Sequence, residues 1–353
     1  ENIYKNGSRV NSGIFPEVSG LERVEVLKGS AAILYGNVAP GGIVNMVTKK
    51  PLFNFGGNIG LNYGSWNSIK PTIDIYGGLT KNSAIRVNGS YENKDSFRDN
   101  ISSEKHYFNP SFLYNISEKT QIIIEADYLK HSFTPDFGLG GLVLNSKTNE
   151  SKLNTLLGID KFVGAKWQYQ TNEMLTSTVT LNHEINSNWN FNTVAFFQNY
   201  TRDFYGTERI QWNLQDNGDY VWKRTLNKQY QEQNYGSIQF NLNGHFKTGK
   251  IQHKLLAGAD ADYLQADTYA YQLQKQNGDF ADAGNNFLYG TNGNTSNGNV
   301  YLSDENSWKS GDMLNSRKKD LNRIPTRRVG FYAQDLISIT DKFKVLAGLR
   351  WSY

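Results

Sequence analysis

Residues 20–51 read GLERVEVLKGSAAILYGNVAPGGIVNMVTKKP, and this stretch decides the fold. Apolar and polar residues alternate over 21–27, which predicts a short strand with one buried face. A helical turn is expected over 31–35. Pro40-Gly41-Gly42 predicts a tight turn, because proline fixes φ and glycine adopts positive φ. With a second strand expected over 43–49, the stretch forms a compact β-turn-α-turn-β unit.

The composition limits the class of protein. The 353 residues include 21 Tyr, 19 Phe, 33 Gly and only 7 Pro, which is typical of a β-rich chain with many turns. No cysteine is present, so disulfides and thiolate metal sites are excluded, and the five histidines show no paired metal-site spacing. A net charge of +4 gives no reason to expect nucleic acid. No run of about 18 apolar residues predicts a transmembrane helix, but barrel strands show only alternation.

After Pro51 the pattern changes to long strands with period-two alternation. In one such strand Ile122, Ile124 and Tyr128 oppose Glu125 and Asp127. Most of the runs reach the nine to eleven tilted residues that cross a bilayer. About eleven strands are expected, near 57–64, 69–79, 83–93, 105–115, 119–131, 172–185, 189–205, 230–246, 250–267, 326–338 and 343–353.

The connections between these strands alternate in length. Those after the second, fourth, sixth, eighth and tenth strands are short. Those after the third, fifth, seventh and ninth are long, near 94–104, 132–171, 206–229 and 268–325. A transmembrane barrel shows this pattern, with short periplasmic turns and longer outer loops. A soluble β-sandwich, the alternative, predicts alternation along strands without two-sided loop asymmetry. We expect 268–325 to be a mobile loop that closes over a ligand, or else a solvated loop with basic residues.

The stretch 20–51 resembles the closing segment of the plug domain in TonB-dependent outer-membrane receptors, in the siderophore-receptor branch. The matching positions are 21–29, Tyr35-Gly36, Pro40-Gly41-Gly42, Asn45 and 47–51. The resemblance implies that residues 1–52 are the C-terminal part of an α+β plug domain. It implies that 53–353 are the N-terminal half of a transmembrane antiparallel β-barrel, about 11 of 22 strands in a mostly β fold. The chain would then be a fragment of a longer receptor.

The function implied by the resemblance is TonB-dependent active import of a ferric siderophore across the outer membrane of a Gram-negative bacterium. The implied partners are TonB, through an N-terminal segment missing here, the ferric chelate, and outer-membrane lipid and lipopolysaccharide, with no nucleic acid. No enzyme activity, resident metal or directly bound cofactor is expected. Import of cobalamin, haem or a glycan by the same family is an alternative, although the Pro-Gly-Gly turn and the 47–51 ending favour siderophores. A barrel adhesin or outer-membrane enzyme would need loop repeats or a catalytic cluster at the rim, and neither is visible.

Three sets of site residues follow. In the family, plug charges form ion pairs with carboxylates on the barrel wall. The resemblance makes Arg23 and Lys28 candidates for such pairs, with Glu25 as a complementary partner. The alternative is that Arg23 and Glu25 are solvated strand residues. The residues Gly29, Gly36, Pro40, Gly41 and Gly42 shape the plug turns rather than contact a ligand. Aromatic rings suit planar chelates. The candidate ligand contacts, which could equally form the interfacial girdle, are Trp66, Phe133, Phe137, Tyr205, Trp212 and Trp222.

Overall fold

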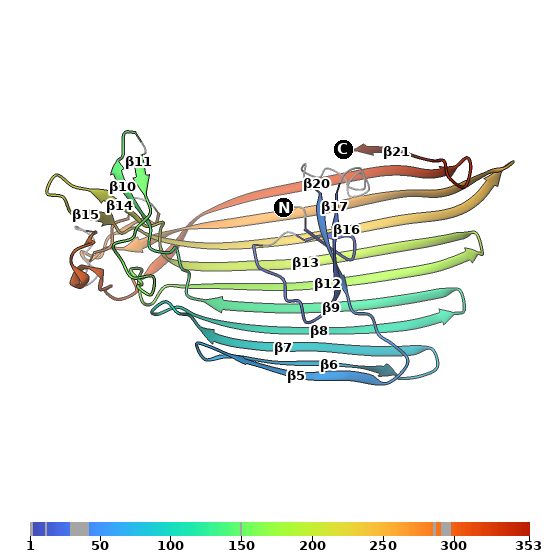
Figure 1. Ribbon diagram of the computed structural model, residues 1–353, viewed down its shortest axis with the longest axis horizontal. Coiled ribbons are helices and arrows are strands. Elements are labelled where there is room, and N and C mark those ends of the chain that lie inside the picture. Colours follow the sequence, from blue (N-terminus) through green and yellow to red (C-terminus); the bar gives the residue numbers. More distant parts are fainter. Residues whose placement is uncertain (1–2, 11–12, 29–41, 149, 285–286, 291–297) are drawn as a thin grey trace.

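A long antiparallel sheet, here called the wall, makes up most of the fold (Figure 1). The computed structural model describes residues 3–10, 13–28, 42–148, 150–284, 287–290 and 298–353. Within these ranges, no helix is long and apolar enough to span a membrane. The strands of the wall follow chain order, each antiparallel to the next: β5 (Gly56–Gly64), β6 (Ser68–Gly78), β7 (Ser83–Asp95), β8 (Ser102–Ser117), β9 (Thr120–Phe133), β12 (Tyr169–Asn186), β13 (Trp189–Thr207), β16 (Leu226–Thr248), β17 (Ile251–Gln274), β20 (Ser316–Ser338) and β21 (Lys344–Ser352), with β18 (Phe280–Asp282) pairing with β17.

The predicted strands and the predicted alternation of loop lengths are confirmed. Short turns gather at one end of the wall and long connections at the other (Figure 1), except that the short connection 65–67 between β5 and β6 lies at the end with the long connections, the one exception that the sequence also shows. The strands run farther toward the long connections than expected, since β17 continues to Gln274 and β20 begins at Ser316. The ladder between them persists through Leu273↔Ser316, with a bulge between Tyr269 and Tyr271. Polar residues on both faces of these extensions hide the period-two signal.

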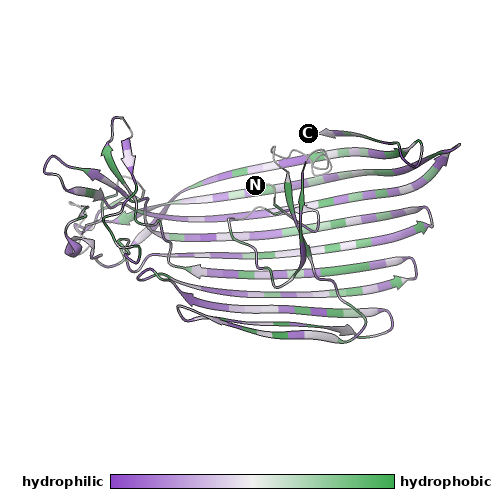
Figure 2. Cartoon of the chain, viewed as in Figure 1, coloured by the Kyte–Doolittle hydropathy of each residue, from purple (hydrophilic) through white to green (hydrophobic). Residues whose placement is uncertain are grey.

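The wall has an apolar outer face and a polar inner face, seen as alternating colours along each strand in Figure 2. The exposed apolar side chains on the outer face include Ile59, Leu61, Ile73, Ile75, Ile85, Ile124, Tyr128, Leu175, Phe197, Ile238, Phe240, Phe331 and Leu349. The inner face buries polar groups such as Asn88, Asn109, Glu125, Asp127 and Gln198. An exposed apolar band on one face and buried charge on the other is the reverse of a soluble sandwich, whose core is apolar.

A second, four-stranded sheet, here called the central sheet, lies across the inner face of the wall (Figure 1). Its order is β2 (Ser8–Arg9), β1 (Ile3–Lys5), β4 (Ile43–Thr48) and β3 (Leu21–Leu27). β1 runs parallel to β4, and β3 runs antiparallel to it with a bulge between Leu21 and Arg23. Both strands predicted in the opening stretch are present. The helical turn expected over 31–35 lies outside the described residues.

The long connections at the other end of the wall fold together into an outer cap. Its sheet has the order β11 (Glu150–Lys152), β10 (Gly141–Asn145), β14 (Gln211–Leu214), β15 (Tyr220–Lys223) and β19 (Asn299–Tyr301), followed by the short helix η3 (Glu305–Trp308). Three different connections therefore contribute to one sheet. The described part of 268–325 is not an irregular solvated loop, since strand ladders and two apolar clusters join it to the neighbouring connections; its closing over a ligand stays a prediction.

Candidate functional site

The space between the central sheet and the wall is the candidate site, and one side of it is closed by buried ion pairs. The Lys5 ammonium lies 2.6 Å from the Asp127 carboxylate, and both side chains are less than a tenth exposed. Tyr107 donates its hydroxyl hydrogen to the same carboxylate at 2.7 Å. A charge removed from water needs such partners, because unpaired burial is very unfavourable. Lys5 therefore joins β1 to β9.

A second carboxylate on β9 collects three groups from the central sheet. Glu125 accepts a hydrogen bond from the Thr48 hydroxyl at 2.5 Å and pairs with the Lys50 ammonium. The Asn6 carboxamide lies 3.4 Å from Glu125 and 2.8 Å from the Thr48 oxygen. Glu125 is 4% exposed. The end of β4 is therefore held to the wall by a connected polar network rather than by one contact.

Two further ion pairs hold the central sheet to the first strands of the wall. Lys49 lies 3.0 Å from Asp74 of β6, whose carboxylate also receives two hydrogen bonds from Arg86. Glu17 lies 2.8 Å from Lys70 of the same strand, with the charges reversed. Burial raises the pKa of Glu17, but hydrogen bonds from Lys70 and Ser19 and the charge of Lys70 outweigh it and hold the pKa below its ordinary value. Both pairs anchor the central sheet at β6.

An apolar cluster adds to these contacts and extends along the wall from β8 to β16. Met46 of β4 belongs to this cluster, as do Val10 and Ile14 of the connection between β2 and β3. They pack against the wall side chains Tyr107, Leu129, Met174, Phe196, Tyr200 and Tyr235. Burying an aliphatic side chain of this size stabilises a contact by about 1.5–3 kcal/mol. The central sheet is thus seated by apolar packing as well as by charge.

The residues predicted to pair with the wall lie elsewhere. Arg23 pairs with Glu25 of its own strand at 2.7 Å, in an exposed position, and Lys28 is also exposed. The pairs with the wall are made by Lys5, Glu17, Lys49 and Lys50. Among the described wall strands no ion pair reaches Arg23, Glu25 or Lys28, so their pairing with a barrel wall stays a prediction. A signal for two of the actual residues was present, because Lys49 and Lys50 close the opening stretch while acidic residues alternate along the wall strands.

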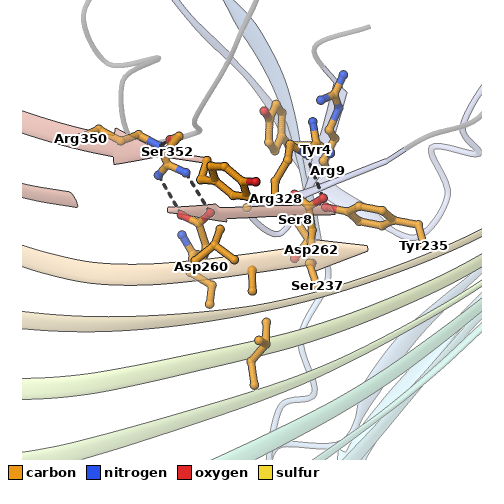
Figure 3. Close-up of a pocket in the computed structure, with 16 residues that line it drawn as sticks. Tyr4, Ser8, Arg9, Tyr235, Ser237, Asp260, Asp262, Arg328, Arg350 and Ser352 are labelled. Carbon is orange, nitrogen blue, oxygen red and sulfur yellow. Dashed lines mark hydrogen bonds and ion pairs between the residues drawn. The ribbon is translucent and has the colours of Figure 1, made fainter. Parts of the chain in front are cut away.

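The opposite side of the site is a cavity of about 250 Å³. Its wall residues come from β16, β17, β20 and β21, and they include Tyr235, Asp260, Asp262, Arg328 and Arg350 (Figure 3). The central sheet contributes Tyr4, Ser8 and Arg9. Asp260 accepts two hydrogen bonds from Arg350, each 2.8 Å long, and Asp262 accepts one from Arg328 at 2.9 Å. These two aspartates line the interior, as their alternation predicts, and each is paired with arginine.

The predicted turn residues are described only at one position. Gly29, Gly36, Pro40 and Gly41 lie outside the described residues. Gly42 has φ +102°, and a Cβ placed there would collide with the carbonyl oxygen of Leu27. Both facts require glycine at this position.

Nearer the outer cap, the inner face carries a guanidinium held in place above the central sheet. Arg202 donates one hydrogen bond to Gln170 and one to Gln229, each 3.2 Å long. Its guanidinium lies 5.2 Å from the ring centre of Phe204, which meets Phe137 edge-to-face. Phe133 is paired in register with Gln170. Phe137 is thus connected to this charge through Phe204, whereas Phe133 lies one strand beyond Gln170 and stacks on His131.

The other aromatic candidates are not gathered at this place. Trp66 is 56% exposed at the β5–β6 turn and lies 6.1 Å from the Phe97 ring. Trp212 and Trp222 are buried in one cluster of the outer cap, and Tyr205 is buried in the other. At most 2% of any of these three side chains is exposed. Their prediction as ligand contacts is therefore corrected: they form the apolar cores that hold the cap together.

A buried arginine ties the cap connections to each other. Arg224 is fully buried and donates hydrogen bonds of 2.9–3.0 Å to the carbonyl oxygens of Tyr289, Trp308 and Lys309. Burial lowers the pKa of Arg224 to about 10. Tyr289 in turn accepts a hydrogen bond from the Trp167 indole at 3.1 Å. Sequence reasoning missed Arg224, because its acceptors are backbone carbonyls far along the chain.

No group of three or more His, Asp or Glu side chains that could hold a metal occurs in the part of the chain that the structure describes. The described polar groups of the site instead offer paired charges, amides and hydroxyls. Such groups can bind and guide a ligand that arrives with its metal already chelated.

A strand wall with an apolar outside and a small sheet seated inside it by ion pairs is the architecture of a partial plugged barrel, and the homologues of this chain are TonB-dependent siderophore receptors. The metal-pseudopaline receptor CntO of Pseudomonas aeruginosa is 28% identical over 255 residues, which are 71% of this chain and 34% of that protein. The catecholate siderophore receptor Fiu of Escherichia coli K12 is 26% identical over 271 residues, 73% of this chain and 36% of that protein. No protein-family model matches the chain.

Solved structures agree on the fold. The siderophore receptor PiuA from Acinetobacter baumannii has a TM-score of 0.83 at 21% identity, covering 99% of this chain and 50% of that one. The ferripyoverdine receptor of Pseudomonas aeruginosa, bound to ferripyoverdine, has a TM-score of 0.81 at 21% identity, covering 99% and 45%. The chain thus spans about a third of the length of these curated relatives and about half of these solved chains. The predicted fold, a partial barrel wall with plug elements, is confirmed.

Proposed function

We propose that the chain is part of an importer that carries a ferric siderophore across the bacterial outer membrane with energy from TonB. Residues 1–52 would act as the end of the plug and 53–353 as half of the barrel. The observation that carries the proposal is the central sheet seated against a polar inner wall by four buried or half-buried ion pairs. The relatives are receptors for metal–pseudopaline, catecholate siderophores and ferripyoverdine, which supports a siderophore as cargo.

The proposed ligand surface is the inner face around Arg202. A fixed guanidinium beside the Phe204 ring, which meets Phe137, with Phe133 farther along the same inner face, suits an anionic chelate with flat aromatic or conjugated groups. The apolar outer face would lie in the membrane, and basic side chains outside it would meet lipid and lipopolysaccharide. Import of cobalamin, haem or a glycan is the alternative, and the cationic site favours an anionic chelate over a neutral glycan.

Growth on single iron sources tests the cargo. A deletion strain, complemented with the natural gene, is supplied with individual ferric siderophores as sole iron source. We expect complementation to restore growth on at least one anionic chelate. Equal growth of the deletion and complemented strains on every siderophore would overturn the proposal.

The role of Arg202 has its own test. Arg202→Gln removes one charge-assisted contact, worth about 1.5–3 kcal/mol, and should weaken chelate binding roughly 10- to 100-fold. Arg202→Lys retains the charge and should weaken binding less. Arg323→Gln is the matched control, because Arg323 pairs with Asp267 on the outer face. Fluorescence quenching by the ferric chelate measures all three affinities; equal affinities for the natural protein and R202Q would exclude this surface.

A further inference from the structure

The two sides of the central sheet contact the wall in different ways. Toward β6–β9, four lysine–carboxylate pairs cross the interface, at Lys5–Asp127, Lys49–Asp74, Lys50–Glu125 and Glu17–Lys70. Toward β16–β21, the wall charges pair within the wall, as Asp260–Arg350 and Asp262–Arg328. Among the described residues, no ion pair joins the central sheet to β16, β17, β20 or β21.

The side without cross-pairs is also the side that contains the cavity (Figure 3). Arg9 enters it from β2, and the buried Nε of Arg9 has no hydrogen-bond partner. Among the described residues that line the cavity, three guanidinium groups, those of Arg9, Arg328 and Arg350, face two carboxylates, so one positive charge is in excess. Ser8, Ser237 and Gln239 add neutral polar groups to the lining. The cavity therefore offers a polar, cationic surface between the central sheet and the wall.

Opening the two sides requires different amounts of free energy. Separating the central sheet from β6–β9 would break buried ion pairs and leave each partner unpaired, at about 3–5 kcal/mol for a fully buried pair. Separating it from β16–β20 leaves Asp260–Arg350 and Asp262–Arg328 intact, because both partners stay on the wall. The apolar cluster reaches Tyr235 of β16 as well as the strands of the anchored side, so the ion pairs are what distinguish the two sides. They make the side with the cavity the easier one to widen.

We propose that the ligand passes between the β1–β2 hairpin and strands β16, β17 and β20, while the central sheet stays attached to β6–β9. This inference rests on the proposed function and adds to it the route and the charge of the ligand. Arg9 supplies the unbalanced positive charge on this route. The passage takes an anionic chelate, and Arg9 is the side chain that it meets on the central sheet.

Cysteine accessibility tests the route, because these 353 residues contain no cysteine, and any cysteine elsewhere in the receptor is first replaced by serine. Ser237→Cys places a thiol on the inner face at the cavity, and Ser111→Cys places one on the inner face of the anchored side, where Ser111 is 5% exposed. Cells producing each variant are treated with a membrane-impermeant maleimide during uptake of a ferric siderophore that supports growth. We expect S237C to be labelled faster while the chelate is being imported and to lose uptake after labelling. S111C should stay unlabelled and active until the protein is denatured.

Arg9→Gln gives a second measurement that does not depend on labelling. It should raise the chelate concentration for half-maximal uptake about tenfold, equivalent to about 1.4 kcal/mol, whereas Arg9→Lys should remain near the natural value. If labelled S237C imports normally, or if S111C is the variant that is labelled and blocked, the route is wrong while import itself stands. If the natural protein imports no ferric chelate at all, the proposed function fails, and the route fails with it.

Discussion

Asp127→Asn should loosen the central sheet without changing the shape of the wall. The substitution keeps an acceptor for the Tyr107 hydroxyl but removes the charge that lies 2.6 Å from the Lys5 ammonium. Losing one partner of a buried pair costs about 3–5 kcal/mol. Since the carboxamide retains one hydrogen bond, we expect the low end, about 3 kcal/mol, or roughly a hundredfold more frequent opening.

Hydrogen exchange on the purified protein in detergent measures this opening. The amides of β1 and β4 should lose about 3 kcal/mol of protection in D127N, while those of β12 and β13 change little. Lys5→Met removes the other charge, and the double variant K5M/D127N should be destabilised by less than the sum of the single variants. A coupling near zero, or unchanged β1 protection in D127N, would refute the reasoning.

Arg23→Ala is the matched control for charge removal. Arg23 pairs with Glu25 while its side chain is 59% exposed. Exposed pairs contribute about 0–1 kcal/mol, so R23A should leave the protection of β1 within that range. A loss as large as that in D127N would mean that Arg23, not Lys5, seats the central sheet.

Three further predictions concern other contacts. Because the pKa of Glu17 is held below its ordinary value of 4.5, its contribution should be complete above that pH and be lost as the pH falls below it. Exchange of amides near Glu17 should therefore rise on acidification, and Glu17→Gln should remove that pH dependence. Gly42→Ala should destabilise the turn before β4 by about 1–3 kcal/mol, measured by β4 exchange, because alanine disfavours φ +102° and its Cβ meets the Leu27 carbonyl. Arg224→Met should make the outer cap sensitive to limited proteolysis over 275–315 while the wall stays resistant, because three carbonyl oxygens lose their donor.

The alternation of the strands was enough to predict which way many side chains point. Ile124 faces outward and Glu125 inward because successive side chains on a strand lie on opposite faces. The lengths of the connections predicted which end of the wall each connection lies at. This signal is also local, because a short turn forces the two strands that it joins to be antiparallel neighbours. The ends of β16, β17 and β20 were missed because their backbone pairing continues beyond the apolar pattern.

Which side chains meet across the interior could not be read from the sequence. Arg23 and Lys5 are both basic residues of the central sheet, and only the placement of β1 across β9 brings Lys5 to Asp127. Trp212 and Trp222 have the composition of ligand contacts, yet they are buried because connections distant in sequence pack into one cap.

By itself, the sequence determined the strands, their faces, the two kinds of connection and the resemblance of 20–51 to a plug segment. Each of these depends on residues that are neighbours along the chain. Only the tertiary structure decided which charges seat the central sheet, where the cavity lies and which aromatics are buried. These features depend on contacts between distant segments. Such contacts are set by the curvature of the wall and by the placement of the central sheet against it.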